Sequence, residues 1–529
     1  MQPDRTPADR VDVCIVGAGP AGALVAHRLA SAGHDVVVLE AGPRFEFEDR
    51  IERMERSIRP AHPPQSVWDM GGERDAYSSV GGHHYPLNVA RVKGVGGTSL
   101  HWQGMVMRMP ESDFDGSHGP AWPIGYEDLR PYYAEAEAAF GVAGAEDNPF
   151  APPRERPFPM PAFGPSHSDS ILAEAAEELE ITTHSVPNAR NSEPRDGRSE
   201  CVGYGTCRPV CPSGAKYDAT VHVGKAEAAG ARVIDEVPVQ RLETDGEGAI
   251  EAAVYATPEG ETHRQRARSF VLAAGGIETP RLLLLSRSET HPDGLANSSG
   301  AVGRYFMDHL FAGAGGTVDR RTRQNHVGFQ TTESHQFYDP DREGVGPLKL
   351  EFLNTAGPSP VEQAMGAEEF GDDLLEQLRE GYGNHIAVGG LVGQRPDPTN
   401  RITLDPDRTD DHGNPVPRID WAVGDRARAT IEWANGIQHR LLEAVDADVG
   451  WTAGPDSTGP AYHHMGTTRM GTDPSHSVVD PACRTHDVEN CWIASSSVFV
   501  TSGAMNPTLT IGALALRVAD RLDERLAQA

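Results

Sequence analysis

The stretch VDVCIVGAGPAGALVAHRLASAGHDVVVLE, residues 11–40, decides the fold. Its first six residues are an apolar run that ends at Gly17, which is typical of a buried strand. Residues 21–32 carry helix formers with apolar positions on one stripe, and Gly33 is a suitable stop. Residues 35–40 form a second apolar run. The stretch therefore predicts a βαβ unit of about 30 residues within an α/β protein.

Three glycines follow the first strand with the spacing Gly17-x-Gly19-x-x-Gly22, and Glu40 ends the second strand. Glycines at this spacing permit a tight turn and close backbone approach, and the helix start faces a diphosphate. The Glu40 carboxylate would accept hydrogen bonds from ribose hydroxyls. With strand, helix and acid all in place, the pattern favours a dinucleotide site over a purely structural turn, but it does not separate NAD from FAD.

Further along the chain, strands and helices alternate in a less regular way. Residues 145–165 are a Pro-rich connector, and residues 231–273 alternate as strands, with hairpin turns expected near residues 245–246 and 259–260. Short strands and two amphipathic helices, near 362–381 and 424–446, predict a separate sheet-based domain between about 305 and 450.

The composition is that of an acidic globular protein. Asp and Glu number 77 against 47 Lys and Arg, which gives a net charge of −30 over 529 residues. This balance argues against nucleic acid and anionic membranes as partners, because both reward a basic face. The chain has four lysines, at positions 93, 216, 225 and 349, and such a composition resembles halophilic proteins or reflects a GC-rich genome.

Targeting and membrane signals are not apparent in the sequence. It contains no run of eighteen apolar residues, so we expect no membrane span. The opening MQPDRTPADR lacks an apolar signal core, so we expect a cytoplasmic protein, or one exported folded with a signal-bearing partner subunit.

Three further segments carry a family resemblance. They are GVGGTSLHW (94–102), AAGGIETPRLLLLS (273–286) and the C-terminal pair YHHMGT (462–467) and NPTLT (506–510). With the fingerprint, they resemble the glucose–methanol–choline (GMC) oxidoreductases from residue 11 to about 526. The resemblance implies FAD and a discontinuous Rossmann-like FAD-binding domain (1–304 and 451–529). A β-sheet substrate-binding domain with helices would then occupy 305–450, which holds no matched motif.

The resemblance implies a catalytic pair near the C-terminus. GMC enzymes remove a hydroxyl proton and pass the carbinol hydride to flavin N5. His463 matches the family's base, a role that suits histidine because its unperturbed pKa is about 6.5. His464 is the competitor, and the spacing to the Gly-Thr that follows favours His463. Asn506 matches the second position, and the residues alone predict it as the N-cap of a helix with Pro507 at N1.

The resemblance also implies which residues hold the cofactor, although it leaves open whether His101 is linked covalently to the flavin. The expected FAD contacts are Gly17, Gly19, Gly22, Glu40, Gly96, Gly97, Thr98, His101, Val237, Pro507 and Thr508.

Three cysteines, Cys201, Cys207 and Cys211, lie within the loop 195–220. Zinc normally takes four ligands, and a disulfide would leave one cysteine over. Three thiolates suit a [3Fe–4S] cluster, and Cys211-Pro212 is similar to the end of a ferredoxin run. The spacing also resembles that of cluster-bearing FAD sugar dehydrogenase subunits of the GMC family. The alternative is three reduced cysteines that serve in packing.

The sequence thus predicts an FAD-dependent dehydrogenase of a small sugar or polyol. Electrons would leave through the [3Fe–4S] cluster to an external acceptor, either an acceptor protein or a small second subunit. Three alternatives stay open: an oxygen-using oxidase of the same fold without a cluster, a non-redox FAD-containing lyase, and a non-catalytic flavin-binding subunit.

Overall fold

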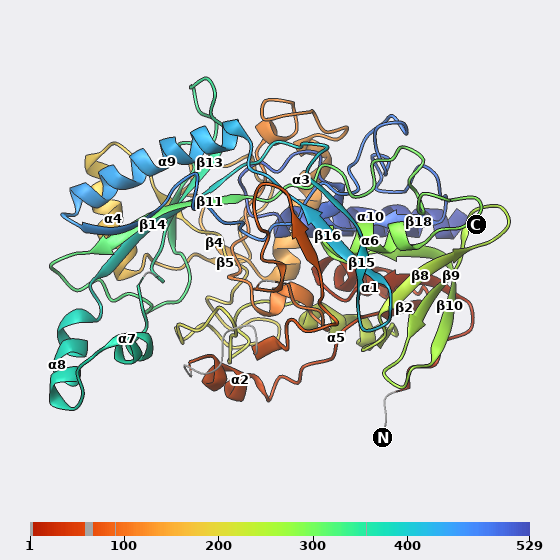
Figure 1. Cartoon of the computed structure of the whole chain (residues 1–529), viewed down its shortest axis with the longest axis horizontal. Helices are drawn as coiled ribbons and strands as arrows, with labels where there is room; N and C mark the ends of the chain where they lie inside the picture. The colour runs from red at the N-terminus through yellow and green to blue at the C-terminus, as the bar shows by residue number, and fades with distance from the viewer. Residues whose placement is uncertain (1–3, 59–66, 90, 356, 529) are drawn as a thin grey trace.

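The computed structural model describes residues 4–58, 67–89, 91–355 and 357–528. Two large sheets organise the chain, one in the right half of Figure 1 and one in the left half. Each sheet has its own cluster of buried hydrophobic side chains. The α/β architecture predicted from the sequence is confirmed.

The right-hand sheet has seven strands in the order β7-β2-β1-β10-β9-β8, with β18 also paired to β10. Strands β7, β2, β1, β18 and the second half of β10 are parallel, and the apolar runs of the inner strands β1 and β2 are buried on both faces. The predicted hairpins join β8, β9 and β10. The strands are β1 (Val11–Val16), β2 (Val36–Leu39), β7 (Arg232–Ile234), β8 (Val239–Thr244), β9 (Ile250–Ala256), β10 (Thr262–Leu272) and β18 (Cys491–Ile493).

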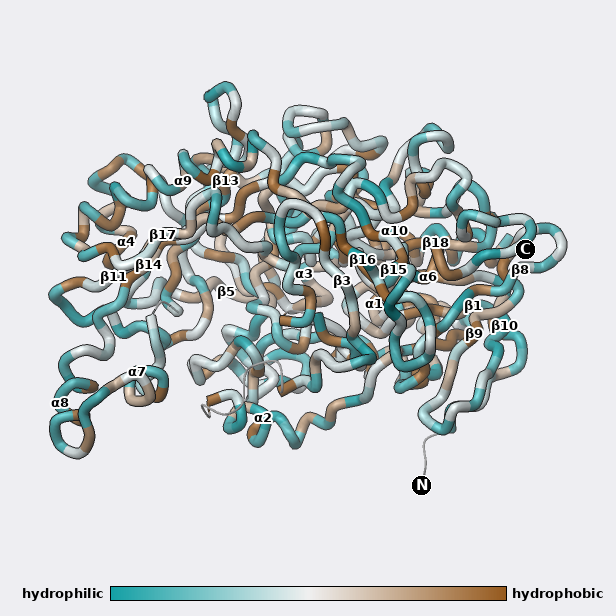
Figure 2. The backbone as a smooth tube through the Cα atoms, in the orientation of Figure 1, coloured by the Kyte–Doolittle hydropathy of each residue, from teal (hydrophilic) through white to brown (hydrophobic). Residues whose placement is uncertain are grey.

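Helices from both ends of the chain pack together on this sheet. Helix α1 (Pro20–Ser31) contacts α5 (Thr220–Ala228) and α10 (Thr508–Gln528), and α10 contacts α3 (Tyr126–Phe140). Figure 2 shows the apolar stretches of α10 and β18 running through this half of the molecule. Helix α6 (Gly275–Leu285) packs against β8. Over the described ranges, no helix is long and apolar enough to cross a bilayer.

The left-hand sheet has six strands in the order β17-β11-β14-β13-β12-β6. Helix α9 (Asp425–Ala444) covers β11 and β14, and α4 (His167–Glu178) packs against α9. Strand β6 comes from outside residues 305–450, and β17 extends beyond position 450. The strands are β6 (His184–Ser185), β11 (Leu310–Thr317), β12 (Thr332–Ser334), β13 (Leu348–Phe352), β14 (His385–Val392) and β17 (Asp448–Ala453).

Smaller elements link the two halves. The sheet β15-β16-β3 packs against α6. The remaining short elements lie within the connecting segments. The smaller elements are β3 (Ser78–Val80), β4 (Ala143–Gly144), β5 (Met160–Pro161), β15 (Arg401–Thr409), β16 (Pro415–Asp420), α2 (Arg50–Ser57) and 3-10 helices at Leu87–Val89, Gly97–Leu100, Glu111–Asp113 and Ser496–Val498.

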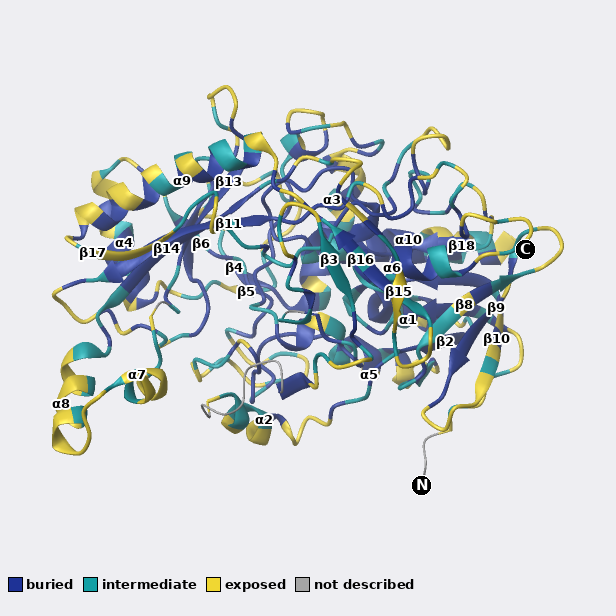
Figure 3. Cartoon of the chain, in the orientation of Figure 1, coloured by how far each residue is buried: buried dark blue, intermediate teal, exposed yellow. Residues whose placement is uncertain are grey.

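The amphipathic segment near 362–381 differs from its prediction. It forms two short helices, α7 (Pro360–Gly366) and α8 (Asp372–Gly381), because Ala367 is extended at the end of α7 and Gly371 before α8 has a φ of 69°. The described residues of both helices include no buried side chain, and Figure 3 shows them projecting from the body. The second predicted helix, near 424–446, is α9.

Candidate functional site

A cavity of about 1090 Å³ lies at the carboxyl ends of the parallel strands of the first sheet. Gly17 follows β1, Glu40 follows β2, Ala273 follows β10 and Ala494 follows β18, and all four line the cavity. Ligands of open α/β sheets bind at this edge. The volume slightly exceeds the range of about 300–1,000 Å³ usual for small-molecule sites, so the cavity has room for a dinucleotide.

Glycines bring two backbone segments together at the floor of this cavity. A Cβ at Gly22 would lie 2.0 Å from the carbonyl oxygen of Gly17, and one at Gly97 would lie 3.1 Å from Cα of Gly19. Helix α1 has Gly19 at its N-cap and no capping side chain. The first-turn N–H groups of α1 therefore face the cavity without a side-chain acceptor, which suits an anionic diphosphate.

Glu40 lies at the edge of the same glycine-lined part of the cavity. Its carboxylate accepts hydrogen bonds from the backbone N–H groups of Ala18 at 2.8 Å and Gly42 at 3.0 Å. The side chain is buried, and burial raises its pKa. Its place after β2 is that of the acid expected to bind a ribose.

The predicted cofactor residues fall into two groups. Three lie behind the cavity wall: Gly22 packs on Gly17, Gly96 N–H donates to the carbonyl of Ala18 at 3.0 Å, and Val237 N–H donates to the carbonyl of Glu40 at 2.8 Å. The others line the cavity itself: Gly17, Gly19, Glu40, Gly97, Thr98, His101, Pro507 and Thr508.

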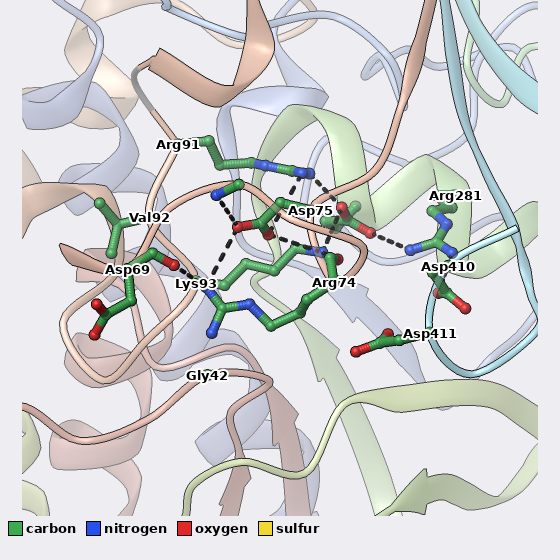
Figure 4. A network of polar contacts seen from close by, with 12 residues as sticks. Gly42, Asp69, Arg74, Asp75, Arg91, Val92, Lys93, Arg281, Asp410 and Asp411 are labelled. Atoms are coloured by element: carbon green, nitrogen blue, oxygen red, sulfur yellow. Dashed lines mark hydrogen bonds and ion pairs between the residues drawn. The ribbon is translucent and has the colours of Figure 1, made fainter. Parts of the chain in front are cut away.

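A charged network on the cavity wall was not anticipated from the sequence (Figure 4). Lys93 Nζ lies 3.3 Å from Glu278 and 3.5 Å from Asp75, and Arg91 forms an ion pair with Glu278. Burial opposes ionisation of Glu278, but Lys93, Arg91 and Arg281 outweigh it and hold its pKa well below the usual range. Arg91 Nη2 also lies 3.9 Å from Oδ1 of Asp75, which ties the second carboxylate into the same network.

His463 and Asn506 line this cavity together, although 43 positions separate their numbers, and His464 lines it too. Nδ1 of His463 lies 2.8 Å from Nδ1 of His309, and the backbone N–H of His463 donates to Asp308 Oδ1 at 2.7 Å. Burial, then His309, Lys349 and His464, lower the pKa of His463 well below 6.5.

His464 has a different environment. Its ring packs beside Tyr85 and Phe306, with ring centroids 5.7 and 6.1 Å away. Its backbone carbonyl accepts a hydrogen bond from Ser496 Oγ at 2.6 Å. Burial lowers the pKa of the ring to about 3. These aromatic contacts are those of a packed side chain.

The predicted N-cap role of Asn506 is wrong. Helix α10 starts at Thr508, and Oδ1 of Asn506 instead accepts a hydrogen bond from Nζ of Lys349 at 2.6 Å. Lys349 is fully buried in β13 and also contacts Glu351 at 2.6 Å and Glu333 at 3.4 Å. A buried ammonium competes for the amide oxygen more strongly than a helix N–H does, because its hydrogen bond is charge-assisted.

A compact group of possible metal ligands lies behind Lys349. Within the part of the chain that the structure describes, His184, Glu333 and His335 are the His, Cys, Asp and Glu residues with ligand atoms all within 4.8 Å of one another. Burial would raise the pKa of Glu333, but Lys349 and His335 outweigh it and lower it to about 2. The ammonium already supplies the positive charge there, so these residues form an ion-pair cluster.

The three loop cysteines are free thiols around one buried guanidinium. Arg190 Nη1 lies 2.9 Å from Sγ of Cys207 and 4.0 Å from Sγ of Cys201. Burial raises the pKa of Cys211, but the N–H and ammonium of Lys216 outweigh it, so the pKa is lowered. The three sulfurs do not meet the 4.8 Å spacing expected around a single ion. A cluster that binds one thiolate per iron spreads its ligands further, so the trio and its two buried cations fit an anionic cluster.

Two basic side chains tie the cysteine loop to the cavity wall. Lys216 Nζ donates to the carbonyls of Leu100 at 3.2 Å, Trp102 at 2.6 Å and Cys207 at 2.8 Å. Arg190 Nη2 donates to the carbonyl of Gln103 at 2.9 Å. The cysteine loop and the cavity segment around His101 therefore share the same two cations, a connection that the cysteine spacing does not predict.

Comparisons with known proteins show which families and folds the chain is similar to. Family models described as GMC oxidoreductase match residues 15–311 and 396–515. The chain is 34% identical to the fructose dehydrogenase large subunit of Gluconobacter japonicus, over 98% of both chains. It is 33% identical to the 2-methyl-1,2-propanediol dehydrogenase of Mycolicibacterium austroafricanum, over 98% of this chain and 96% of the other. The fold is similar to that of a formate oxidase variant from Aspergillus oryzae, with a TM-score of 0.69 at 17% identity over 98% and 99% of the chains.

Proposed function

The chain belongs to the GMC oxidoreductase family, and we propose that it is an FAD-dependent dehydrogenase that oxidises a CH–OH group of a sugar or polyol. One observation supports this above all. An imidazole and a carboxamide, those of His463 and Asn506, line the same cavity as the glycine cradle that begins at Gly17.

The side chains of the cavity suit removal of a proton from an alcohol. Neutral His463 would accept the hydroxyl proton, since its lowered pKa keeps it unprotonated near neutral pH. Asn506 would donate a hydrogen bond to the same substrate oxygen from its NH₂ group, because its Oδ1 is taken by Lys349. FAD bound in the cradle would accept the hydride from the carbinol carbon at N5.

The side chains on the far wall of the cavity support the proposed preference for a sugar or polyol. That wall comes from the second sheet and combines apolar side chains with polar ones, which suits a molecule rich in hydroxyl groups. We therefore propose residues 305–450 as the substrate domain. The lining residues from this region include Phe311, Gln330, Glu351, Leu353, Thr355 and Leu391.

We further propose that Cys201, Cys207 and Cys211 hold a [3Fe–4S] cluster. Such a cluster would pass electrons singly to an external acceptor. Two fully buried cations, Arg190 and Lys216, would offset the negative charge of three thiolates and the cluster. The name of the Gluconobacter relative, a large subunit, supports the existence of a partner subunit.

The test is anaerobic mixing of FAD-loaded protein with aldoses, ketoses, polyols and short 1,2-diols. We expect at least one substrate to bleach the flavin absorbance. His463→Ala should keep FAD but fail to bleach, whereas His439→Ala, which changes an exposed histidine on α9, should bleach normally. Bleaching by His463→Ala together with failure of His464→Ala would reverse the assignment of the base.

The alternatives give different results in the same preparation. An iron-free protein that produces peroxide in air would be an oxidase. A protein that binds FAD and turns over a substrate without anaerobic bleaching would be a lyase. If neither bleaching nor turnover occurs with any substrate, the chain is a flavin-binding subunit.

A further inference from the structure

His309 lies directly behind His463 and is fully buried. The two rings meet edge to face, with centroids 5.0 Å apart and planes at 82°. Nδ1 faces Nδ1 at 2.8 Å, so a single hydrogen bond joins the rings and one of the two nitrogens must carry its hydrogen.

The second ring nitrogen of His309, Nε2, determines which of the two Nδ1 atoms carries the hydrogen. Nε2 of His309 lies 2.9 Å from the backbone carbonyl oxygen of Ser502, and a carbonyl can only accept a hydrogen bond. The hydrogen of neutral His309 is therefore on Nε2, and its Nδ1 is an acceptor. Burial lowers the pKa of His309 to about 4, which keeps the ring neutral and leaves Nδ1 without a second hydrogen near pH 7.

The same reasoning determines which nitrogen of His463 carries the hydrogen. Since Nδ1 of His309 accepts, Nδ1 of His463 must carry the hydrogen, and Nε2 of His463 keeps its lone pair. The carbonyl of Ser502 thus fixes the tautomer of one ring, and that ring fixes the tautomer of the next.

The backbone around the two histidines holds this alignment. Asp308 accepts from the backbone N–H of His463, and Met307 and Met465 form an antiparallel bridge with N···O distances of 2.9 and 3.0 Å. The residues just before β11 therefore hold both the backbone and the ring of His463. A base whose ring is held in this way loses little freedom when it meets a substrate.

We propose that His309 is a positioning residue that holds His463 as the Nδ1–H tautomer and so presents Nε2 as the base of the reaction. The proton balance is simple. The substrate O–H bond breaks, an N–H bond forms at Nε2 of His463, and His463 carries the positive charge. His309 keeps its single hydrogen and accepts from Nδ1–H throughout. The use of Nε2 as a base rests on the proposed function, whereas the tautomer does not.

The tautomer can be read without any substrate. Long-range ¹H–¹⁵N spectra of histidine-labelled, FAD-loaded protein distinguish protonated from bare ring nitrogens, and the His463→Gln difference spectrum assigns the ring. We expect Nδ1 of His463 to be protonated and Nε2 bare. The reverse pattern in the wild type would overturn the proposal, whether or not any alcohol reduces the flavin.

Variants of His309 link the tautomer to the rate. His309→Leu removes the acceptor, so we expect His463 to lose its single tautomer and flavin reduction to slow on the order of 100-fold. His309→Asn can place an amide oxygen near the position of Nδ1, so it should restore much of both readouts. His439→Asn is the surface control. An unchanged His463 spectrum in His309→Leu with a wild-type reduction rate would contradict the proposal.

His309→Asp adds a readout that a purely packing role would not produce. A carboxylate that accepts from Nδ1–H favours the imidazolium form of His463, so the acid limb of flavin reduction should move to higher pH. The groups that face His463 are His309, Lys349 and His464, and the last two are unchanged in this variant. An acid limb at the wild-type position would contradict the positioning role of His309.

If His309→Leu does not fold, the measurements on His309→Asn and His309→Asp test the proposal. If the wild type has the expected tautomer but no alcohol bleaches the flavin, the proposed function fails and the positioning role stands.

Discussion

The ammonium of Lys349 lies 2.6 Å from Oδ1 of Asn506, across 157 positions of sequence. A lysine ammonium can only donate, so this contact identifies the oxygen of the carboxamide and directs its NH₂ group elsewhere. Lys349 is at the centre of the second sheet, and Asn506 precedes the last helix. The second sheet thereby orients a side chain that lines the cavity of the first.

Asn506→Asp tests the NH₂ group with little change in shape. The carboxylate can still accept from Lys349, so the fold should be kept, but it offers no hydrogen to a substrate oxygen. We expect flavin reduction to slow by about 10²–10³, the usual effect of losing one such donor. Stopped-flow absorbance at saturating substrate measures this rate. A rate within a few-fold of wild type would remove Asn506 from the reaction.

Lys349→Met should be costly for stability. The substitution leaves Glu333 and Glu351 buried without their ammonium, and breaking a buried ion pair from one side costs about 3–5 kcal/mol. Lys225→Met is the matched control, because Lys225 is partly exposed and pairs with Asp196 at the surface, where such a pair is worth about 0–1 kcal/mol. Urea unfolding of the two variants should differ clearly, and equal midpoints would contradict the prediction.

The pH dependence of flavin reduction should reflect the buried base. The base works in its neutral form, and burial, His309, Lys349 and His464 all lower its pKa. As pH falls from 8, activity should therefore persist through 6.5, the unperturbed value, and decline only below it. Rates of reduction across this range measure the limb, and a midpoint above 6.5 would show that the imidazole is not the depressed base described here.

Glu40→Ala should weaken FAD binding. The variant removes the expected ribose acceptor and leaves the N–H groups of Ala18 and Gly42 without their partner. A lost hydrogen bond to a charged group is worth about 1.5–3 kcal/mol, which is roughly a 10- to 100-fold rise in Kd. Titration of deflavinated protein with FAD measures this, and Glu243→Ala, which changes a partly exposed carboxylate of β8 outside the cavity lining, is the control. An unchanged Kd would exclude Glu40 from the site.

Cys207→Ser tests the proposed cluster. We expect iron, acid-labile sulfide and the EPR signal of the oxidised protein to fall together, since serine is a poor ligand for iron–sulfur clusters. Cys14→Ala changes a buried cysteine in β1, away from the loop, and should keep all three. Wild-type protein that contains no iron after anaerobic purification would refute the cluster while leaving the flavin assignment intact.

The parts of the site that the sequence predicted are those with short-range patterns. The spacing of Gly17, Gly19 and Gly22 is a local property of one turn, and Glu40 follows one strand later. His463 could be suggested because it lies in a recognisable segment. The surroundings of these residues are determined by a few adjacent positions in the chain, so a local sequence pattern is enough to predict their place.

His309 and Lys349 could not be predicted in the same way. Each is an isolated residue in a region without a motif, and its partner lies more than 150 positions away. Their roles depend on how β11 and β13 sit against the C-terminal segment, which apolar periodicity does not specify. Arg190 and Lys216 were missed for a related reason, because the cysteine spacing does not tell which cations fold onto the loop.

The place of β18 beside β10 has a consequence for synthesis. Strand β10 pairs with β1 on one side and its first half pairs with β9 on the other, but the second half of that other side waits for Cys491–Ile493, more than 200 positions later. At usual elongation rates of about 5–20 residues per second, that wait lasts roughly ten to forty seconds. During that interval the ribosome-bound chain carries an open strand edge, the kind of surface that chaperones shield from aggregation.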